Sequence, residues 1–344
     1  MKNWLLFVLF WLPFLSSGQI VTVSEKLSIR NNGTYELLGK MGEQVLLYRK
    51  RSGQQFEIQA YDEQLRLTWN KVLQFDQKKA NVIAMIPNQD ELSVIYGFKE
   101  KGTLYLKANK YDAQINLIDS TTIASYSHRL VTPNFQVTYS EDRQHALIFS
   151  IQNQSKVKAL SFHLQSMQLL WENEFSIAVA QFYTNPIEVL TTNKGELYLI
   201  ISHDNRRSSR DQHLYEVLYC RQGLKQAKRM AISMEGRLSF DAVFSYDNLN
   251  RNLVAGGLYA QKNLNRANGY FSLKLPSQSP EKYQLKFIPF EDTFISDIGG
   301  KKIKDSKGLK NIAIRDIIFR RDGGMLLVFE TARLHKRKPN MVRV

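Results

Sequence analysis

The most constraining feature of this sequence is a short apolar run that recurs about every 50 residues. The five runs lie at residues 45–48, 92–96, 146–149, 197–201 and 253–258. Each is too short for a stable helix and rich in β-branched or aromatic residues, which indicates a strand covered on both faces. A period near 50 residues is typical of four-stranded propeller blades. The runs therefore predict the second strand of each blade.

Residues 43–73 show the repeated unit most clearly, as three consecutive short strands. After the apolar run, two segments alternate apolar and polar residues, which indicates strands with one buried and one solvated face. The segment 61–67 recurs at 111–117, with Tyr, Asp, Gln and Leu in register. Asp62 and Asp112 then stand at turns, where Asp binds its own backbone, and we interpret them as turn formers rather than as part of a sugar site.

Two tryptophans occupy one position of this unit. Trp69 and Trp171 are separated by about two periods, and the other tryptophans lie in the first 18 residues. We predict that both are buried at equivalent positions of their blades, because chance placement explains the match less well than a repeat does.

The last unit is half the length of the others. Residues 312–319, a turn at 321–324 and residues 325–330 supply two strands, and an isolated strand is predicted near the N-terminus at 20–29. We predict an all-β fold, a β-propeller of about six four-stranded blades in one domain spanning 19–344. The N-terminal strand can complete the last blade, since pairing the chain ends removes an exposed edge.

The N-terminal 18 residues have the pattern of a secretory signal peptide. Lys2 precedes an apolar run at 4–15, and small residues follow at 16–18. Twelve apolar residues are too few to cross a bilayer comfortably, which disfavours the alternative of an uncleaved anchor. No cysteine lies near this site, so we expect an exported protein of the periplasm or cell exterior without a lipid anchor. We expect a monomer without a transmembrane span once the leader is removed.

Motifs for chemistry are absent from the sequence. It contains no phosphate-binding Gly-rich loop, no zinc-protease motif and no serine-hydrolase elbow. Its one cysteine, Cys220, cannot form an intramolecular disulfide, and we predict that it is buried and inert. We therefore assign no catalytic residue and no cofactor.

One local cluster has the residue types of a metal site, namely His203, Asp204, Asp211 and His213. Three arginines, Arg206, Arg207 and Arg210, lie between these residues and would repel a cation. We interpret the cluster as part of a solvated hairpin loop and predict no metal there.

The net charge of +15 is concentrated near the C-terminus. The last 45 residues hold 13 Lys and Arg against 4 Asp and Glu. Most of these basic residues belong to an insertion at 291–311, which we predict to be a long loop, and to a basic tail at 332–344. The candidate polyanion-binding residues are Lys301, Lys302, Lys304, Lys336, Arg337 and Lys338.

Anionic envelope polymers or lipid head groups would suit a surface formed by these residues. The alternative is a charged surface that is solvated and binds nothing. Nucleic acid is disfavoured because no aromatic residues are interleaved for base stacking.

Several motifs together resemble uncharacterised exported β-propeller-like repeat proteins of Bacteroidota. They are the leader without a lipid-attachment cysteine, the strand with Leu67 and Trp69, the segments 256–259 and 269–273, and the hairpin 321–328. The resemblance implies an exported repeat domain and leaves its ligand open.

Two classes of function are compatible with these patterns. The first is an exported non-enzymatic binding or interaction module of the cell envelope, with a protein, a glycan or an anionic lipid as partner. The alternative is a carbohydrate-active hydrolase or lyase that uses the propeller channel. Fold alone does not decide between them. The lack of a recognised catalytic motif favours the binding module.

Overall fold

The computed structural model describes residues 21–23, 34–51, 55–127, 133–153, 155–177, 187–203, 213–261, 266–299 and 308–331. The leader, the basic tail and most of the predicted N-terminal strand lie outside them. Residues 21–23 of that predicted strand are described, and they form no strand. Val21 and Val23 are 72% and 80% exposed. Among the described residues, no helix has the length and apolar character needed to cross a bilayer.

The chain divides into two compact units, Met1–Ser127 and His128–Val344. The first unit contains two four-stranded antiparallel blades, and in each the strands pair in chain order. Blade 1 consists of β1 (Thr34–Met41), β2 (Gln44–Arg51), β3 (Gln55–Tyr61) and β4 (Leu67–Val72). Blade 2 consists of β5 (Asn81–Pro87), β6 (Glu91–Glu100), β7 (Thr103–Asp112) and β8 (Leu117–Ser127).

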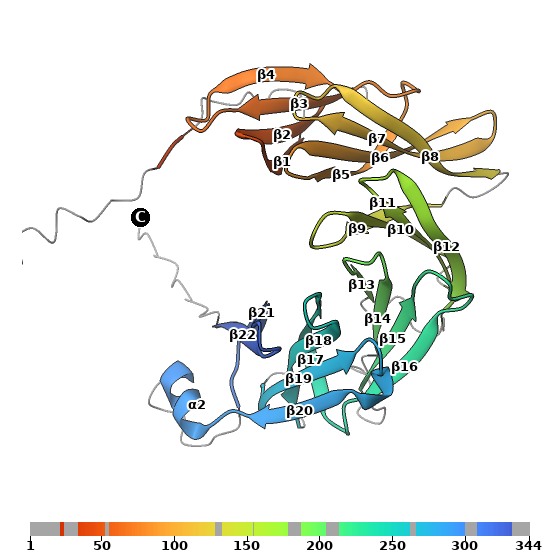
Figure 1. Ribbon diagram of the computed structural model, residues 1–344. Helices are drawn as coiled ribbons and strands as arrows, with labels where there is room; N and C mark the ends of the chain where they lie inside the picture. Colours follow the sequence, from red (N-terminus) through yellow and green to blue (C-terminus); the bar gives the residue numbers. More distant parts are fainter. Residues whose placement is uncertain are drawn as a thin grey trace, which may run out of the picture. The chain divides into compact units, whose positions relative to one another are not determined.

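The second unit contains three more four-stranded blades and a two-stranded sheet (Figure 1). Blade 3 consists of β9 (Gln136–Tyr139), β10 (His145–Gln152), β11 (Lys156–His163) and β12 (Gln168–Ser176). Blade 4 consists of β13 (Ile187–Thr191), β14 (Leu197–His203), β15 (Leu214–Cys220) and β16 (Lys228–Ser233). Blade 5 consists of β17 (Leu238–Asp247), β18 (Asn252–Ala260), β19 (Gly269–Pro276) and β20 (Gln284–Pro289). Sheet 6 consists of β21 (Ile312–Phe319) and β22 (Met325–Thr331).

The prediction of an all-β fold built from propeller blades is confirmed. Each predicted apolar run lies in the second strand of a blade, in β2, β6, β10, β14 and β18. Strands β6, β10 and β14 are buried along most of their length, and β18 is buried along all of it. Within the second unit, the first strands β9, β13, β17 and β21 contact one another in succession, as inner strands of neighbouring blades do.

Carboxylates on two inner strands join neighbouring blades of the second unit. Glu188 on β13 accepts a hydrogen bond from the backbone N–H of Phe244 on β17. Asp241 Oδ2 on β17 accepts one from the backbone N–H of Ile314 on β21, at 2.7 Å. Each bond satisfies a backbone donor that would otherwise be buried without a partner, so these two side chains link blade 4 to blade 5 and blade 5 to sheet 6.

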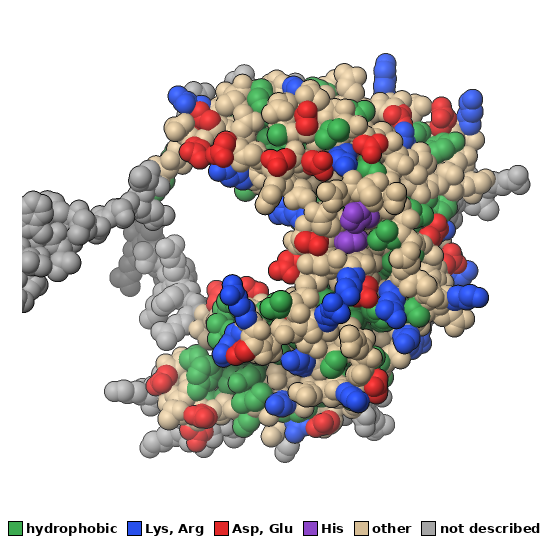
Figure 2. All heavy atoms as spheres, in the orientation of Figure 1, with side chains coloured by type: hydrophobic (Ala, Val, Ile, Leu, Met, Phe, Trp, Pro, Cys, Tyr) green, Lys and Arg blue, Asp and Glu red, His purple; other side chains and the backbone are tan. Residues whose placement is uncertain are grey.

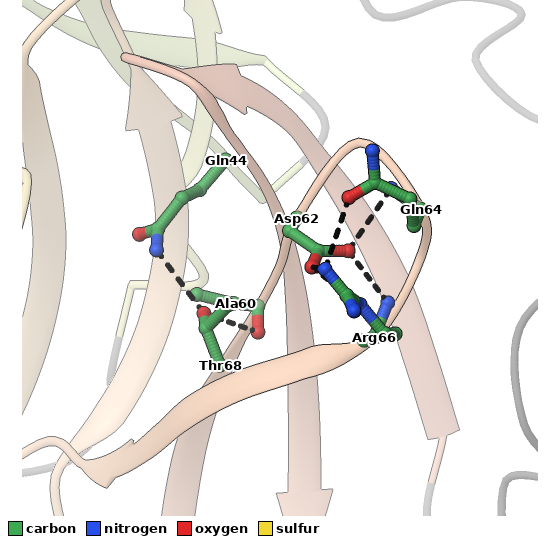
Figure 3. A network of polar contacts seen from close by, with 6 residues as sticks. All are labelled: Gln44, Ala60, Asp62, Gln64, Arg66 and Thr68. Carbon is green, nitrogen blue, oxygen red and sulfur yellow. Dashed lines mark hydrogen bonds and ion pairs between the residues drawn. The ribbon is translucent and has the colours of Figure 1, made fainter.

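The repeated Asp of blades 1 and 2 forms its turn as predicted. Asp62 Oδ1 accepts hydrogen bonds from the backbone N–H groups of Gln64 and Arg66, each at 2.9 Å (Figure 3). Hydrogen bonding by the Arg66 backbone is the main reason that the pKa of Asp62 lies below its usual value. Asp112 binds the backbone N–H groups of Gln114 and Asn116 in the same way. The Tyr-Asp repeat is therefore a structural element of the β3–β4 and β7–β8 turns.

The two tryptophans occupy equivalent positions but differ in burial. Trp69 pairs with Ala60 and Trp171 with Ser161, each beside the same irregularity in the strand pairing. Trp171 is 9% exposed, and its Nε1–H donates to the backbone oxygen of Gly195 in the next blade, at 3.0 Å. Trp69 is only half-buried, and its Nε1–H donates to Gln44 Oε1 of its own blade at 3.0 Å. The prediction of burial is thus confirmed for Trp171 and wrong in degree for Trp69.

The insertion at 291–311 is not a loop throughout, because it begins with helix α2 (Asp292–Gly299). Phe294, Ile295 and Ile298 recur at helical spacing and pack in an apolar cluster with Leu258 and Leu309. Asp292 lies in the first turn, where a negative charge favours the helix dipole. These contacts explain why the segment is helical, although it is too short for its apolar periodicity to predict a helix.

Candidate functional site

The basic residues proposed from the sequence as a polyanion-binding surface all lie outside the described residues. On the visible face of the described chain, Lys and Arg side chains are interspersed with Asp and Glu (Figure 2). The described parts of both units thus present mixed charge on this face, and the basic surface stays a prediction.

The residues of the possible metal cluster make separate contacts where they are described. His203 Nε2 lies 3.0 Å from Glu216 Oε2. His213 Nδ1 accepts a hydrogen bond from the backbone N–H of Ser239 at 3.0 Å. Asp204 and Asp211 lie outside the described residues, within which no group of three or more side chains has the arrangement of a metal site.

Shifted pKa values do not mark a catalytic pair in the described chain. Burial raises the pKa of Glu188 to about 7, and the Phe244 N–H opposes this rise. Burial, together with the neighbouring His163, lowers the pKa of His145, whose ring centroid lies 4.8 Å from that of His163. Neither Glu188 nor His145 is hydrogen-bonded or ion-paired to another described carboxylate or histidine whose pKa is displaced.

A cleft of about 370 Å³ lies between blades 4 and 5. One wall is formed by β14, β15 and β16 of blade 4. The other is formed by the end of β19 and by the connection that leads from it to β20. We call this site the blade 4/5 cleft. Its lining residues are Tyr198, Val217, Tyr219, Lys228, Arg229, Met230, Leu275, Ser277, Gln278, Pro280 and Glu281.

The connection between β19 and β20 takes its shape from local sequence. Pro276 ends β19, and Pro280 begins the short 3₁₀ helix η2 (Pro280–Lys282). A proline has no N–H to donate and a fixed φ angle, so it suits the first position of a helical turn. The backbone N–H of Ser277 donates to the carbonyl of Arg251 at 3.1 Å, which fixes the start of the connection. Ser277 is thereby placed at the base of the cleft.

Three hydroxyl groups form a chain at this base. Ser277 Oγ lies 2.7 Å from the Tyr198 hydroxyl and 2.9 Å from the Tyr246 hydroxyl. Burial raises the pKa of both tyrosines, so both remain protonated phenols at neutral pH. The hydroxyls of Tyr198 and Tyr246 are also hydrogen-bonded to each other. The three hydroxyls therefore hold one another in place at the base of the cleft.

Tyr219 forms part of the blade 4 wall beside Tyr198. The two residues are directly opposite each other on β15 and β14, and their ring centroids lie 4.9 Å apart. The Tyr219 hydroxyl donates to Glu196 Oε1 at 2.7 Å. Burial and this bond to a carboxylate both raise the pKa of Tyr219. Its ring is therefore held in place before any ligand arrives.

The charged groups of the cleft differ in how strongly they are held. Arg229 Nε lies 2.7 Å from Glu216 Oε1, and its Nη2 donates to the carbonyl of Ser176 at 3.1 Å. The side chains of Lys228, Gln278 and Glu281 are exposed at the mouth and make no hydrogen bond or ion pair to other described residues. The cleft thus combines a fixed, mostly apolar floor with three polar side chains that are available to a ligand.

Sequence reasoning missed this cleft. Tyr198 and Ser277 are 79 residues apart, and only the packing of blade 4 against blade 5 brings them together. A usable signal was present in the tyrosines of blade 4, because Tyr198 and Tyr219 fall on adjacent predicted strands that pair in the repeated unit.

No protein-family model and no curated protein matches this sequence. Similar solved structures include the β-propeller domain of the Trilobed protease from Pyrococcus furiosus, at 11% identity and a TM-score of 0.45, covering 87% of this chain and 80% of that chain. The WD40 domain of SCAP from fission yeast is 9% identical with a TM-score of 0.36, covering 84% and 72%. A Synechocystis apocarotenoid oxygenase is 9% identical with a TM-score of 0.37, covering 83% and 64%.

Proposed function

We propose that this chain is an exported, non-enzymatic binding module of the cell envelope, and that it binds its ligand in the blade 4/5 cleft. The observation that carries the proposal is the cleft itself. Its floor is mostly apolar and its few polar groups converge on one volume, as in sites that bind small molecules or single residues of a polymer.

Internal hydrogen bonds make the cleft a preformed site. Tyr198, Tyr219 and Arg229 are each held by a partner inside the protein. Side chains that are already ordered lose little conformational entropy when a ligand binds, which favours affinity. The geometry favours binding over catalysis, since the hydroxyl and carboxylate contacts of these three residues orient the cleft walls rather than activate a nucleophile.

The envelope location is part of the proposal and is supported by sequence. The predicted signal peptide at 1–18 directs export, and the basic residues Lys301, Lys302, Lys304, Lys336, Arg337 and Lys338 would attract anionic polymers or lipid head groups. The partner would then be an envelope component, and the cleft would supply the specific contact.

The proposal is tested by filling the cleft. Gln278→Trp places a large side chain at the mouth, while Gln222→Trp makes the same exchange at an exposed turn of blade 4. Immobilised full-length mature protein would be exposed to fractionated envelope protein, glycan and lipid, and the bound mass recorded. We expect one fraction to bind the unmodified protein and the Gln222→Trp control but not Gln278→Trp.

Retention of all binding by Gln278→Trp would show that the cleft is not the site. Binding of no fraction by the unmodified protein would reject the binding function. Thermal unfolding of each variant confirms that a loss of binding does not come from a loss of fold.

A further inference from the structure

The three available side chains at the mouth of the cleft restrict the chemistry of its ligand. Lys228 presents an ammonium, which only donates hydrogen bonds, and Glu281 presents a carboxylate, which only accepts them. Gln278 can do both. A ligand that satisfies the three must therefore carry a strong acceptor for Lys228 and hydroxyl or amine hydrogens for Glu281.

The interior of the cleft adds one further requirement. Val217, Met230 and Leu275 offer apolar surface, so the ligand must have a face of C–H groups. The ligand thus has an apolar face, several hydroxyls and one acidic group.

We propose that the blade 4/5 cleft binds a carboxylate-bearing sugar residue, such as a uronic acid unit of an acidic glycan. The inference rests on the proposed binding function and names the ligand class of the same cleft. The sugar carboxylate meets the Lys228 ammonium, ring hydroxyls meet Glu281 and Gln278, and the C–H face of the ring packs on the apolar floor.

Related ligands satisfy only some of these groups. A neutral sugar leaves Lys228 without an anionic partner, and an aromatic acid leaves Glu281 without a donor. A free amino acid carries an ammonium and a carboxylate, but both groups are attached to the same carbon atom. Lys228 and Glu281 stand on the two different walls, in β16 of blade 4 and in η2 of blade 5, so a longer ligand is needed to reach both.

The test uses three probes on the full-length mature protein in isothermal titration calorimetry: a galacturonic acid trimer, a neutral galactose trimer and the dipeptide alanylalanine. The variants are Lys228→Gln and Gln278→Trp. Lys225→Gln is the matched control, since Lys225 is exposed in the same blade and does not line the cleft.

We expect the acidic trimer to bind about tenfold more tightly than the neutral trimer, as one charge-assisted hydrogen bond predicts. Lys228→Gln should remove this tenfold preference. Gln278→Trp should weaken binding of both trimers, and Lys225→Gln should change neither. Preference for the dipeptide, or a tenfold preference for the acidic over the neutral trimer that persists in Lys228→Gln, would overturn the ligand class.

The outcome separates this inference from the proposed function. If an envelope fraction still binds in a Gln278-dependent way while the acidic trimer does not, the binding function stands and the sugar acid is rejected. If the acidic trimer binds equally well to Gln278→Trp, it is held by basic residues elsewhere and the cleft is not its site.

Discussion

Replacing Glu188 by Gln should change how the stability of the second unit depends on pH. Glu188 lies on inner strand β13, where burial raises its pKa to about 7 from an ordinary value of 4.5. The unfolded chain ionises this group above pH 4.5, whereas the folded chain keeps it protonated until about pH 7. The contribution of Glu188 to stability is therefore fully present below pH 4.5 and is lost as the pH rises through 7.

The magnitude follows from the pKa difference. A shift of one pKa unit corresponds to about 1.4 kcal/mol, so the rise of the Glu188 pKa corresponds to about 3 kcal/mol of unfolding free energy lost between acidic and mildly basic pH. The amide that replaces the carboxyl group in Glu188→Gln does not titrate, and its carbonyl can still accept the hydrogen bond from Phe244. As the pH increases, the free energy of unfolding of Glu188→Gln should therefore rise relative to that of the unmodified protein, by up to about 3 kcal/mol above pH 7.

The assay is urea unfolding at a series of pH values from 4 to 8.5, followed by the fluorescence of Trp171 in a Trp69→Phe variant without residues 1–18, which hold the other two tryptophans. Trp171 lies in blade 3 and reports on the same unit as Glu188. Glu235→Gln is the control, because that carboxylate is exposed and its ion pair is with Arg237 on the surface. A stability difference between Glu188→Gln and the unmodified protein that is equal at pH 4.5 and pH 8 would refute the reasoning.

Three further predictions concern the core, the thiol and the basic tail. Trp171→Ala should lower the free energy of unfolding by about 3 to 5 kcal/mol, because it leaves a cavity in the core. Trp69→Ala should lower it by less, because Trp69 is only half-buried. Urea unfolding measures both losses, and equal losses would contradict the difference in burial. Cys220 is fully buried and burial raises its pKa, so a thiol reagent should label it only after unfolding, and rapid labelling of the folded protein would disprove its inertness. Changing Lys336, Arg337 and Lys338 to Ser should weaken binding to anionic liposomes, most clearly at low salt where the charges are least screened, and equal binding by both proteins would reject the polyanion surface.

Much of the fold could be predicted from local pattern. A strand covered on both faces reads as a continuous apolar run, which is why the runs at 197–201 and 253–258 identified β14 and β18. The strand at 312–319 was predicted with the bounds that the structure shows, because the turn at 321–324 marks the start of its partner. Turn chemistry was equally local, as the hydrogen bonds of Asp62 show.

The features that sequence reasoning missed depend on packing between distant segments. Helix α2 is eight residues long, and a helix of that length is not stable on its own. The packing of its apolar residues with Leu258 and Leu309 stabilises it. Trp69 and Trp171 have the same place in the repeat, yet only Trp171 is covered by a hairpin of the next blade. The blade 4/5 cleft joins residues from two blades, so no spacing within one segment could reveal it.

The most direct test of ligand binding in the blade 4/5 cleft is chemical footprinting of two lysines. The folded full-length mature protein would be reductively methylated with and without the envelope fraction that it binds, and the modification of each lysine measured by mass spectrometry. Binding in the cleft predicts that Lys228 becomes protected while Lys225, outside the cleft in the same blade, does not. Equal modification of Lys228 with and without the bound fraction would contradict it.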